Sequence, residues 1–481
     1  MKIFTIFQMG NKKEQIRKFV IFLFWIVLWQ GVTLLIQNEV LLAGPLTVLK
    51  ELIKEIKEID FYKSVVFSFV RIMTGFFLGL GSGILLGAIS FFYPFIKELM
   101  APIVTLLKTI PIASFVVLLL IWAGSKNLSI YISFLVVFPN VYLNTIMGFS
   151  NADKKIIEMA QVFQLSSGRK LFFLYLPSLL PFLISSIEVS IGMSFKSGVA
   201  AEVIGTPQFS FGEKLYMSKI HINTAGVFAW TLVIILVSYL MEKLVLYLVK
   251  KASKIPSRTN YWKKRMKKWD GLQNKEKEFL TKEIQIKDLS KAYEGKNVLN
   301  HINLSLKRGG VYCLMGPSGG GKTTFFHILL GLIQPDKGEI IGIDTGEICA
   351  VFQEPRLLEE YDAMENAFLF GSLSKGLEWE EKELRLLLPP ESRHKASKEL
   401  SLGMQRRVAI LRAMNCDAPL VVMDEPFAGL DEKTKEITAA YILEKKRDKT
   451  LLVSTHNIND VNLLKGELID GNKSGFDWDN G

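Results

Sequence analysis

Apolar residues are distributed unevenly along this chain, and their pattern divides it into two parts. Before about residue 250, several apolar runs approach the length of about 20 residues that a membrane-spanning helix needs. After about residue 280 there are no runs of this length. Six segments qualify as spans: about 19–36, 65–92, 102–123, 128–149, 179–203 and 225–248. The pattern predicts an all-α transmembrane domain of six helices over residues 1–250.

The second part follows a different pattern. From about Glu283 onward, short β-rich runs alternate with charged segments of helical character. This alternation is typical of an α/β domain built on a largely parallel sheet. We therefore expect an α/β domain over 282–481, joined to the membrane part by a linker over 251–281.

The second candidate span carries a regular row of glycines. They recur at every fourth position, which places them on one face of a helix: Gly75, Gly79, Gly83 and Gly87. Such a row permits close approach of a neighbouring helix. We interpret it as a packing surface rather than as a binding site.

The distribution of basic residues predicts the orientation of the spans. Lys12, Lys13, Arg17 and Lys18 lie shortly before the first span. Residues 250–268, after the last span, contain nine basic residues and no acidic one. Because cytoplasmic flanks are enriched in Lys and Arg, both termini should be cytoplasmic, which an even number of spans requires. By the same parity the polar stretch Glu158–Pro177 between spans four and five is cytoplasmic.

The basic linker has an amphipathic pattern of its own. Trp262, Met266 and Trp269 are spaced as on one face of a helix, with basic residues around them. A short helix lying on an anionic membrane surface explains this pattern. A nucleic-acid patch is the alternative, but basic residues just inside a last span usually face lipid headgroups, so we expect membrane lipid and no nucleic acid.

Composition adds two constraints. Hydrophobic residues make up 49% of the 481 positions, which excludes an ordinary soluble enzyme. The three cysteines, Cys313, Cys349 and Cys416, have no metal-ligand spacing, and we interpret them as buried apolar side chains in a reducing compartment. The first apolar run lacks a small-residue cleavage site, so it is a span rather than a signal peptide.

One segment of the second part carries a phosphate-binding motif. An apolar run, Val311–Met315, is followed by Gly316, four further residues, and then Gly321, Lys322 and Thr323 at the start of a helical pattern. In this strand–loop–helix context, backbone N–H groups cradle phosphates, the lysine reaches the β- and γ-phosphates, and the hydroxyl ligates Mg²⁺. The motif predicts a P-loop NTPase domain that binds a nucleoside triphosphate.

Three other strand-like runs end at polar residues. They end at Gln353, at Asp424 and Glu425, and at His456. In a doubly wound sheet these ends meet at the carboxyl edge, where ligands bind. Asp424 is placed to join the Mg²⁺ shell, and Glu425 to polarise an attacking water.

Together these motifs resemble the nucleotide-binding domain of ATP-binding cassette (ABC) transporters over about residues 282–465. The stretch "KELSLGMQRRVAI" resembles the family's signature helix, with Ser401 and Gly403 where the family contacts the γ-phosphate of the partner's ATP. "EPFAGLD" resembles the segment after the catalytic glutamate and ends at Asp431. Tyr293 matches the aromatic residue that stacks on adenine.

The resemblance implies ATP and Mg²⁺ as cofactors and assigns roles to residues. The expected catalytic residues are Glu425, the switch histidine His456 and the lid glutamine Gln353. The expected Mg²⁺ residues are Thr323, Gln353 and Asp424. The expected nucleotide-binding residues are Tyr293, Gly316, Pro317, Ser318, Gly319, Gly320, Gly321, Lys322, Thr323, Thr324, Ser401, Gly403 and Asp431. The signature departs from the commonest family pattern at Leu402 and Met404.

The stretch Glu158–Pro177 resembles the cytoplasmic loop of importer membrane subunits, which in that family forms a coupling helix docked on the ATPase. Five residues match the family pattern: Glu158, Ala160, Leu174, Leu176 and Pro177. Gln164 stands where the family usually has glycine. The six-span layout and "FKSGVAAEVIG" most resemble permeases of the nitrate, sulfonate and taurine group, which includes thiamine-precursor carriers.

These features predict a permease, with its coupling loop at 151–177, fused to its ATPase. We expect ATP-driven import of a small solute, an organic anion or a vitamin precursor, by a homodimer in a bacterial plasma membrane. Short external loops imply a separate extracytoplasmic solute-binding protein or lipoprotein. An exporter or a non-transporting membrane ATPase is the alternative, but exporters lack the loop pattern and the other class usually has a large external domain.

Three ionisable residues fall at or near membrane depth: Arg71, Glu188 and Lys196. Such residues raise the question of a role in function. Lys196 could attract an anionic solute, or it could pair with Glu188 or Glu202 as part of the structure; the sequence leaves both open.

Overall fold

The computed structural model describes residues 12–254, 283–317, 319–370 and 377–470. The chain divides into two compact units. The first unit comprises Met1–Asn151 and Pro177–Ser253, and the second comprises Ala152–Leu176 and Lys254–Gly481. The amphipathic helix predicted around Trp262 lies outside the described residues.

The first unit is helical. Its helices are α1 (Lys12–Ile36), α2 (Pro45–Ile56), α3 (Ile59–Phe92), α4 (Pro94–Thr109), α5 (Ile112–Ala123), α6 (Leu128–Ser150), α9 (Leu176–Gly205), α10 (Phe211–Ile220) and α11 (Thr224–Lys254). Among the described residues, five helices are long and apolar enough to cross a membrane, or six if α4 and α5 together form one span.

The third predicted span, over 102–123, differs from the prediction of a single helix. It is divided between α4 and α5, whose axes differ in direction by 105°. The break falls at Ile110, in an extended conformation, followed by Pro111. Proline disfavours helical backbone in the residue before it. Hydropathy reports the apolar length of a segment and not its direction, so it could not reveal this bend.

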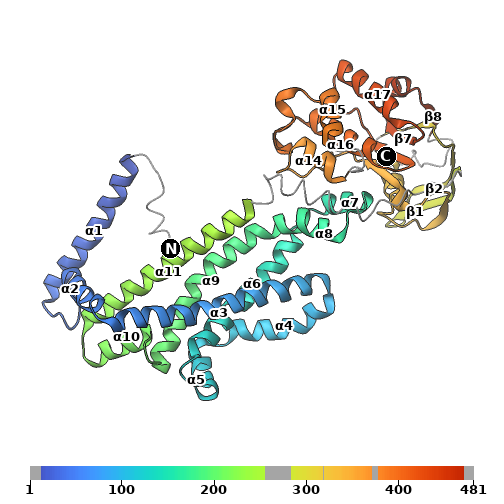
Figure 1. Ribbon diagram of the computed structural model, residues 1–481. Helices are drawn as coiled ribbons and strands as arrows, with labels where there is room; N and C mark the ends of the chain where they lie inside the picture. The colour runs from blue at the N-terminus through green and yellow to red at the C-terminus, as the bar shows by residue number, and fades with distance from the viewer. Residues whose placement is uncertain (1–11, 255–282, 318, 371–376, 471–481) are drawn as a thin grey trace. The chain divides into compact units, whose positions relative to one another are not determined.

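Helices α3 and α6 lie side by side (Figure 1). The glycine row of α3 packs closely against α6, as predicted. A Cβ atom at Gly75 would lie 2.2 Å from the carbonyl oxygen of Ile130, and one at Gly83 would lie 2.8 Å from the Cβ of Val141. Gly81, on another face of α3, has no such neighbour within 4 Å in the part of the chain that the structure describes. The row therefore serves helix packing, because any side chain there would separate the two helices.

The second unit begins with the loop between α6 and α9. This loop contains α7 (Lys154–Val162), α8 (Ser167–Lys170) and the π-helical turn η2 (Leu171–Tyr175). Its buried side chains, among them Met159, Phe163 and Phe173, belong to the same hydrophobic core as the strands that follow residue 283. This shared core is why the loop belongs to the second unit rather than to the helices that it connects.

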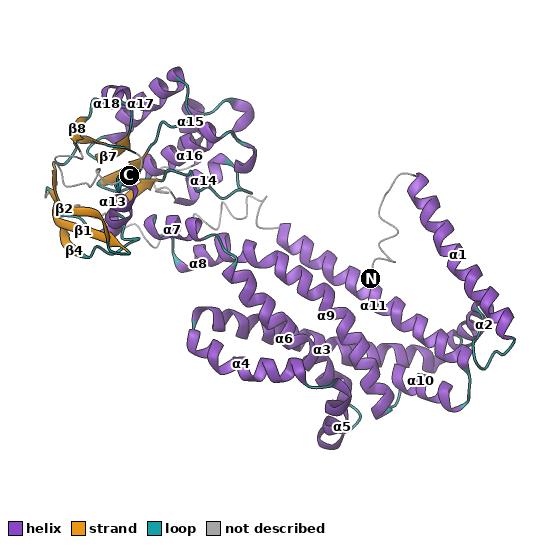
Figure 2. Cartoon of the chain, turned by 180° about the vertical axis from the view of Figure 1, so that it is seen from behind, coloured by secondary structure: helices purple, strands orange, loops and turns teal. Residues whose placement is uncertain are grey.

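The strands of the second unit form two sheets (Figure 2). An antiparallel sheet has the order β2-β1-β4, from β1 (Ile284–Tyr293), β2 (Lys296–Leu306) and β4 (Lys337–Ile341). A parallel sheet has the order β5-β6-β7-β3-β8, from β3 (Val311–Met315), β5 (Ile348–Val351), β6 (Leu420–Asp424), β7 (Thr450–Thr455) and β8 (Glu467–Asp470). The predicted α/β domain with a largely parallel sheet is confirmed.

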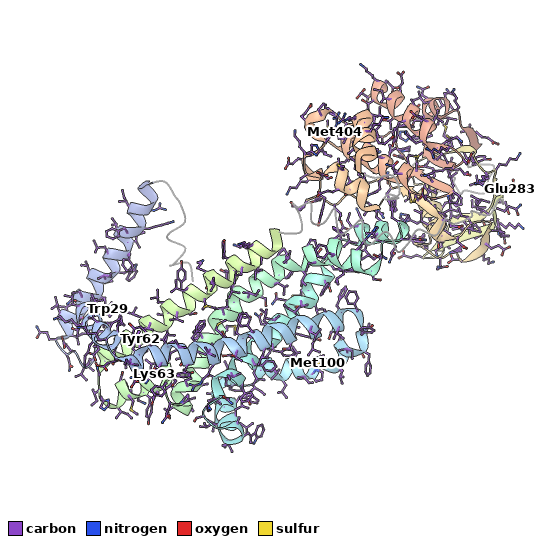
Figure 3. The ribbon with its side chains drawn as sticks, viewed as in Figure 1. Trp29, Tyr62, Lys63, Met100, Glu283 and Met404 are labelled. Carbon is purple, nitrogen blue, oxygen red and sulfur yellow. A yellow bond between two sulfur atoms is a disulfide. The ribbon has the colours of Figure 1, made fainter. Side chains whose placement is uncertain are left out.

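Helices connect these strands. They are α13 (Lys322–Leu329), α14 (Ala363–Phe370), α15 (Leu377–Leu387), α16 (Leu402–Asn415), α17 (Glu432–Lys446) and α18 (Ile458–Leu464). Met404 near the start of α16 and Glu283 next to β1 lie on opposite sides of the second unit (Figure 3). The start of α16 is thus remote from the antiparallel sheet.

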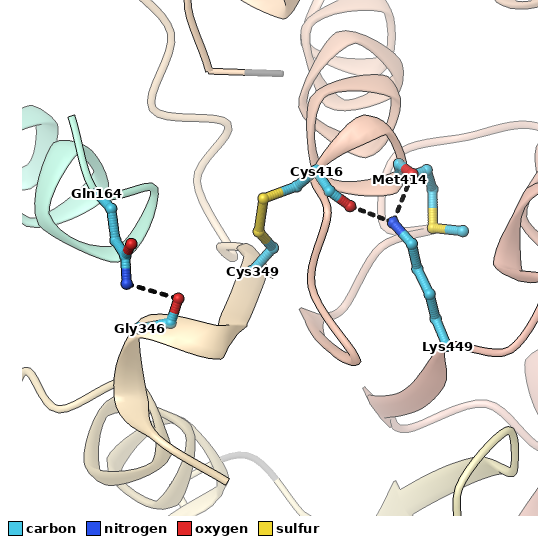
Figure 4. The surroundings of a disulfide bond; sticks show 6 residues. All are labelled: Gln164, Gly346, Cys349, Met414, Cys416 and Lys449. Carbon is cyan, nitrogen blue, oxygen red and sulfur yellow. Dashed lines mark hydrogen bonds between the residues drawn. A yellow bond between two sulfur atoms is a disulfide. The ribbon is translucent and has the colours of Figure 1, made fainter. Parts of the chain in front are cut away.

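The cysteines correct one expectation. Cys349 in β5 and Cys416 after α16 form a disulfide (Figure 4), although no disulfide was expected from the sequence. They are 67 positions apart, and parallel pairing of β5 with β6 brings the segments together. Cys313 is a free thiol and is buried, as expected, and burial raises its pKa to about 11.

Candidate active site

The phosphate-binding motif has the predicted strand–loop–helix arrangement between β3 and α13. Gly321 has a φ of +83°, and a Cβ atom there would lie 2.8 Å from the carbonyl oxygen of Val298. Only glycine meets both conditions. The backbone therefore turns directly into the N-terminus of α13, where N–H groups are available for phosphate oxygens.

Lys322 is the first residue of α13 and is 7% exposed. Its Nζ donates to the carbonyl oxygens of Gly316 and Pro317, at 2.6 Å each. Burial lowers the pKa of Lys322, while Glu425 and Asp424 act in the opposite direction. The ammonium therefore lies on the loop that would hold the phosphates. Gly319, Gly320 and Thr324 belong to the same segment, and Ser318 lies outside the described residues.

A set of oxygen atoms beside the loop fits a Mg²⁺ ion. Thr323 Oγ1 donates to Asp424 Oδ2 at 2.9 Å, and Ser454 Oγ donates to Asp424 Oδ1 at 2.5 Å. Hydroxyl and carboxylate oxygens are the ligands that Mg²⁺ prefers, completed by water and substrate phosphates. Since substrate phosphates and water complete the coordination of Mg²⁺, this hydroxyl and carboxylate set suits an ion that binds together with a nucleotide. Among the described residues there is no group of three or more His, Cys, Asp or Glu side chains that could hold a metal ion.

Glu425 has a strained backbone that several contacts hold in place. Its φ is +48°, a region that non-glycine residues rarely occupy. Its N–H donates to the carbonyl and the hydroxyl oxygen of Ser454, at 3.3 and 3.1 Å. His456 Nδ1 lies 3.6 Å from Glu425 Oε1. The structure thus brings together two of the residues predicted to be catalytic, and strain of this kind is concentrated at functional sites.

Arg406 connects Glu425 to the third of these residues, Gln353. Its Nη1 donates to the carbonyl oxygen of Glu425 at 2.6 Å and its Nη2 to that of Gln353 at 2.7 Å. Arg406 is 5% exposed, and burial lowers its pKa. Sequence reasoning missed it, because an arginine within a helical pattern is usually a solvated side chain.

The remaining predicted residues lie at the ends of their elements. Tyr293 ends β1 at a tight turn and is 43% exposed. Ser401 caps α16 by accepting a hydrogen bond from the N–H of Met404 at 3.3 Å, and Gly403 follows in the first turn. Asp431 caps α17 by accepting from Thr434, which lowers the pKa of Asp431. Exposed positions of this kind are open to a ligand.

The loop between α6 and α9 contacts the segment that follows β5. Arg356 Nη1 donates to Glu158 Oε2 at 2.8 Å, and its guanidinium lies 3.8 Å from the ring centroid of Phe352. Lys155 Nζ is 2.6 Å from Glu354 Oε2. The first turns of α7 therefore contact Glu354 and Arg356, which follow Gln353 in the chain.

Arg412 supports this segment from α16. It is fully buried, and burial lowers its pKa to about 9. It donates to the carbonyl oxygens of Pro355 and Arg356, at 3.0 and 2.9 Å, and contacts the sulfur of Met159 in α7. Neither Arg356 nor Arg412 could be predicted from the local pattern, because both roles depend on distant parts of the chain.

The ionisable residues of the first unit have different environments. Glu188 and Lys196 are both exposed, and among the described ion pairs none joins Lys196 to Glu188 or to Glu202. Glu202 is fully buried and accepts hydrogen bonds from Ser68 and Ser129, at 2.6 and 3.2 Å. The predicted alternative in which Lys196 is paired is therefore not found among the described residues.

Two family descriptions match different parts of the chain. Residues 299–428 match the family "ABC transporter", and residues 79–254 match the family "Binding-protein-dependent transport system inner membrane component".

Individual proteins are also similar. "Taurine import ATP-binding protein TauB" of Roseobacter denitrificans is 34% identical over 206 residues, which cover 39% of this chain and 76% of that protein. "Aliphatic sulfonates import ATP-binding protein SsuB 2" of Pseudomonas syringae pv. tomato is 32% identical over 181 residues, which cover 37% of this chain and 78% of that protein. A solved structure, "Dimeric structure of a post-hydrolysis state of the ATP-binding cassette MJ0796 bound to ADP and Pi", is 30% identical, with a TM-score of 0.35, and the match covers 39% of this chain and 93% of that one.

The contacts of Arg406 generate a prediction. Arg406→Lys keeps the positive charge, but a single ammonium does not reproduce the planar guanidinium fork that spans two carbonyls. Hydrogen bonds from a charged donor contribute about 1.5–3 kcal/mol each. We expect the kcat for ATP hydrolysis to fall by about tenfold or more with the KM for ATP nearly unchanged.

The control is Arg393→Lys, which makes the same change in a side chain that donates to the carbonyl of Leu388. Steady-state ATPase assays measure both variants. Equal kcat values for the two would show that Arg406 does not position Glu425 and Gln353.

Proposed function

Because the chain belongs to the ABC transporter family, as a permease domain joined to an ATPase domain, we propose that it imports a small solute as a homodimer. ATP hydrolysis drives the transport. The observation that carries this proposal is the position of Ala152–Leu176: this segment connects two apolar helices, yet it packs within the ATPase unit. A loop of this kind connects ATP hydrolysis to the helices of the permease.

The proposed ATP site combines the residues described above. Backbone N–H groups of Gly316–Gly321 and the ammonium of Lys322 hold the phosphates. Thr323, Asp424 and Gln353 would hold Mg²⁺, which would neutralise phosphate charge when bound. Glu425 accepts a hydrogen bond from the attacking water and orients it, and His456 lies close enough to support this carboxylate. Tyr293 stacks on the adenine, and Asp431 belongs to the surface that meets the second chain.

The residues at the start of α16 support a homodimer. Ser401 and Gly403 lie at the N-terminus of α16, a favourable position for a phosphate. Leu402 between them is 57% exposed although it is apolar. In the family these residues complete the ATP site of a second cassette. We propose that Ser401 of one chain and Lys322 of the other bind the same ATP.

The domain limits and partners are part of the same proposal. The permease domain occupies 1–250 with its coupling loop at 151–177, the basic linker 251–281 and the ATPase domain 282–481. Both termini and the ATPase face the cytoplasm of a bacterial cell. The family matched by residues 79–254 supports a separate solute-binding protein, and the taurine and sulfonate import relatives support an organic anion as the solute.

Glu425→Gln tests the catalytic assignment. The amide keeps the shape of the side chain but is a much weaker base, so we expect ATP hydrolysis to fall by about 100-fold or more with ATP affinity preserved. Uptake of labelled taurine or an alkylsulfonate into vesicles, measured with a matching binding protein, should be lost in parallel. The control is Glu432→Gln, at an exposed carboxylate on the surface of α17. Turnover by Glu425→Gln within about threefold of the control would remove Glu425 from the mechanism.

Complementation tests the homodimer. Lys322→Ala and Ser401→Arg should each inactivate both sites of a dimer of identical chains. A mixed dimer has one site with both lesions and one site with neither. ATPase activity should therefore return, up to about half of the wild-type value, in dimers isolated through two different affinity tags. The control pair carries Lys322→Ala in both chains, and activity no greater than that of the control would contradict sites shared between chains.

A further inference from the structure

The chain leaves helix α7 through Gln164, two residues after Val162, and the backbone of Gln164 favours glycine. Gln164 has a φ of +51°. Its N–H donates to the carbonyl oxygen of Gln161, and the N–H of Leu165 donates to that of Ala160, at 2.9 Å each. This pair of bonds closes a helix through a left-handed residue, which is most often glycine. A glutamine here is less stable than glycine would be, unless its side chain compensates.

The side chain of Gln164 does make a contact that glycine could not make. Its Nε2 donates to the carbonyl oxygen of Gly346 at 2.6 Å (Figure 4). Gly346 lies in a short 3₁₀ turn, Thr345–Glu347, which precedes β5. Reciprocal hydrogen bonds between Asp344 and Glu347 fix the conformation of this turn. The carbonyl is therefore presented by a well-defined part of the ATPase unit.

Gly346 is the matching partner of Gln164. A Cβ atom at Gly346 would lie 1.8 Å from Gln164 Nε2. Gly346 is not among the glycines with positive φ, so its backbone does not itself require glycine. A side chain at this position would displace the amide from the carbonyl and break the hydrogen bond. The hydrogen bond thus requires both the side chain of Gln164 and a glycine at position 346.

We infer that Gln164 and Gly346 form a docking latch that makes the permease loop specific for its own ATPase domain. The latch fixes the end of α7, while the contacts of Lys155 and Glu158 fix its beginning. A cassette with a side chain in place of Gly346 cannot form the latch and binds this loop more weakly. The inference rests on the coupling role proposed above for the loop.

The latch also connects the folding of the loop end to docking. When the loop is undocked, the amide of Gln164 is left to water, and the unfavourable backbone of Gln164 remains. When the loop is docked, the hydrogen bond to Gly346 compensates for that backbone. Docking therefore stabilises the helix end, whereas a glycine at position 164 would close the helix whether or not the loop is docked.

A double-mutant cycle in the full-length protein tests the latch. The variants are Gly346→Ala, Gln164→Gly and the two combined, with Gln161→Ala as the control at an exposed glutamine one turn earlier in α7. The measured quantity is the amide hydrogen-exchange rate of residues 154–165 in lipid nanodiscs. A lost hydrogen bond changes such an equilibrium by about fivefold.

We expect Gly346→Ala alone to accelerate exchange about fivefold, and Gln161→Ala to leave the rate unchanged. In the Gln164→Gly background, Gly346→Ala should have no further effect, because there is no side chain to displace. An equal acceleration in both backgrounds, or none in either, would overturn the latch. This cycle reads docking and not transport, so a failure of the coupling role would leave its result unchanged.

Discussion

The segment from Gln353 to Arg356 is held by arginines that donate to its backbone carbonyls, and the contact between the catalytic residues and α7 depends on this arrangement. Arg406 binds the carbonyl of Gln353, and Arg412 binds those of Pro355 and Arg356. Because Arg412 is fully buried, its guanidinium must find acceptors inside the protein. The carbonyls of this segment provide them, so its path is tied to α16.

The segment therefore lies between the catalytic residue Glu425 and α7 of the permease loop. On one side, Arg406 binds the carbonyl of Glu425 as well as that of Gln353. On the other side, the side chain of Arg356 binds Glu158 in α7. If contact with Mg²⁺–ATP shifts Gln353, packed and hydrogen-bonded groups would therefore transmit the displacement to α7. The coupling that we propose depends on this short, contiguous connection.

Local sequence predicted the parts of the structure that depend on local chemistry. Spacing along a single element was enough to predict two features. These are the glycines and lysine of the phosphate loop and the glycine row of α3. The bend at Pro111 was missed because apolar length carries no direction. Other features depend on the fold and not on local sequence. The Cys349–Cys416 disulfide depends on the order of the strands. The roles of Arg356, Arg406 and Arg412 depend on contacts between distant segments, and Arg356 contacts a loop residue nearly 200 positions away.

Gln164 lies between these cases. The sequence marked it as a departure from the glycine of related loops, but only the structure provides the carbonyl of Gly346 that its side chain binds. A departure from a family pattern at a left-handed position is therefore a reason to search for a compensating contact.

In this mechanism, nucleotide binding alters the docking of the permease loop. Hydrogen exchange of α7 amides in the Glu425→Gln protein, with and without Mg²⁺–ATP, measures this effect. We expect ATP to change the exchange rate of α7, and Arg356→Met in the same protein to remove this change while ATP still binds. Identical α7 exchange with and without bound ATP, in the protein that retains Arg356, would mean that nucleotide binding does not reach the permease loop.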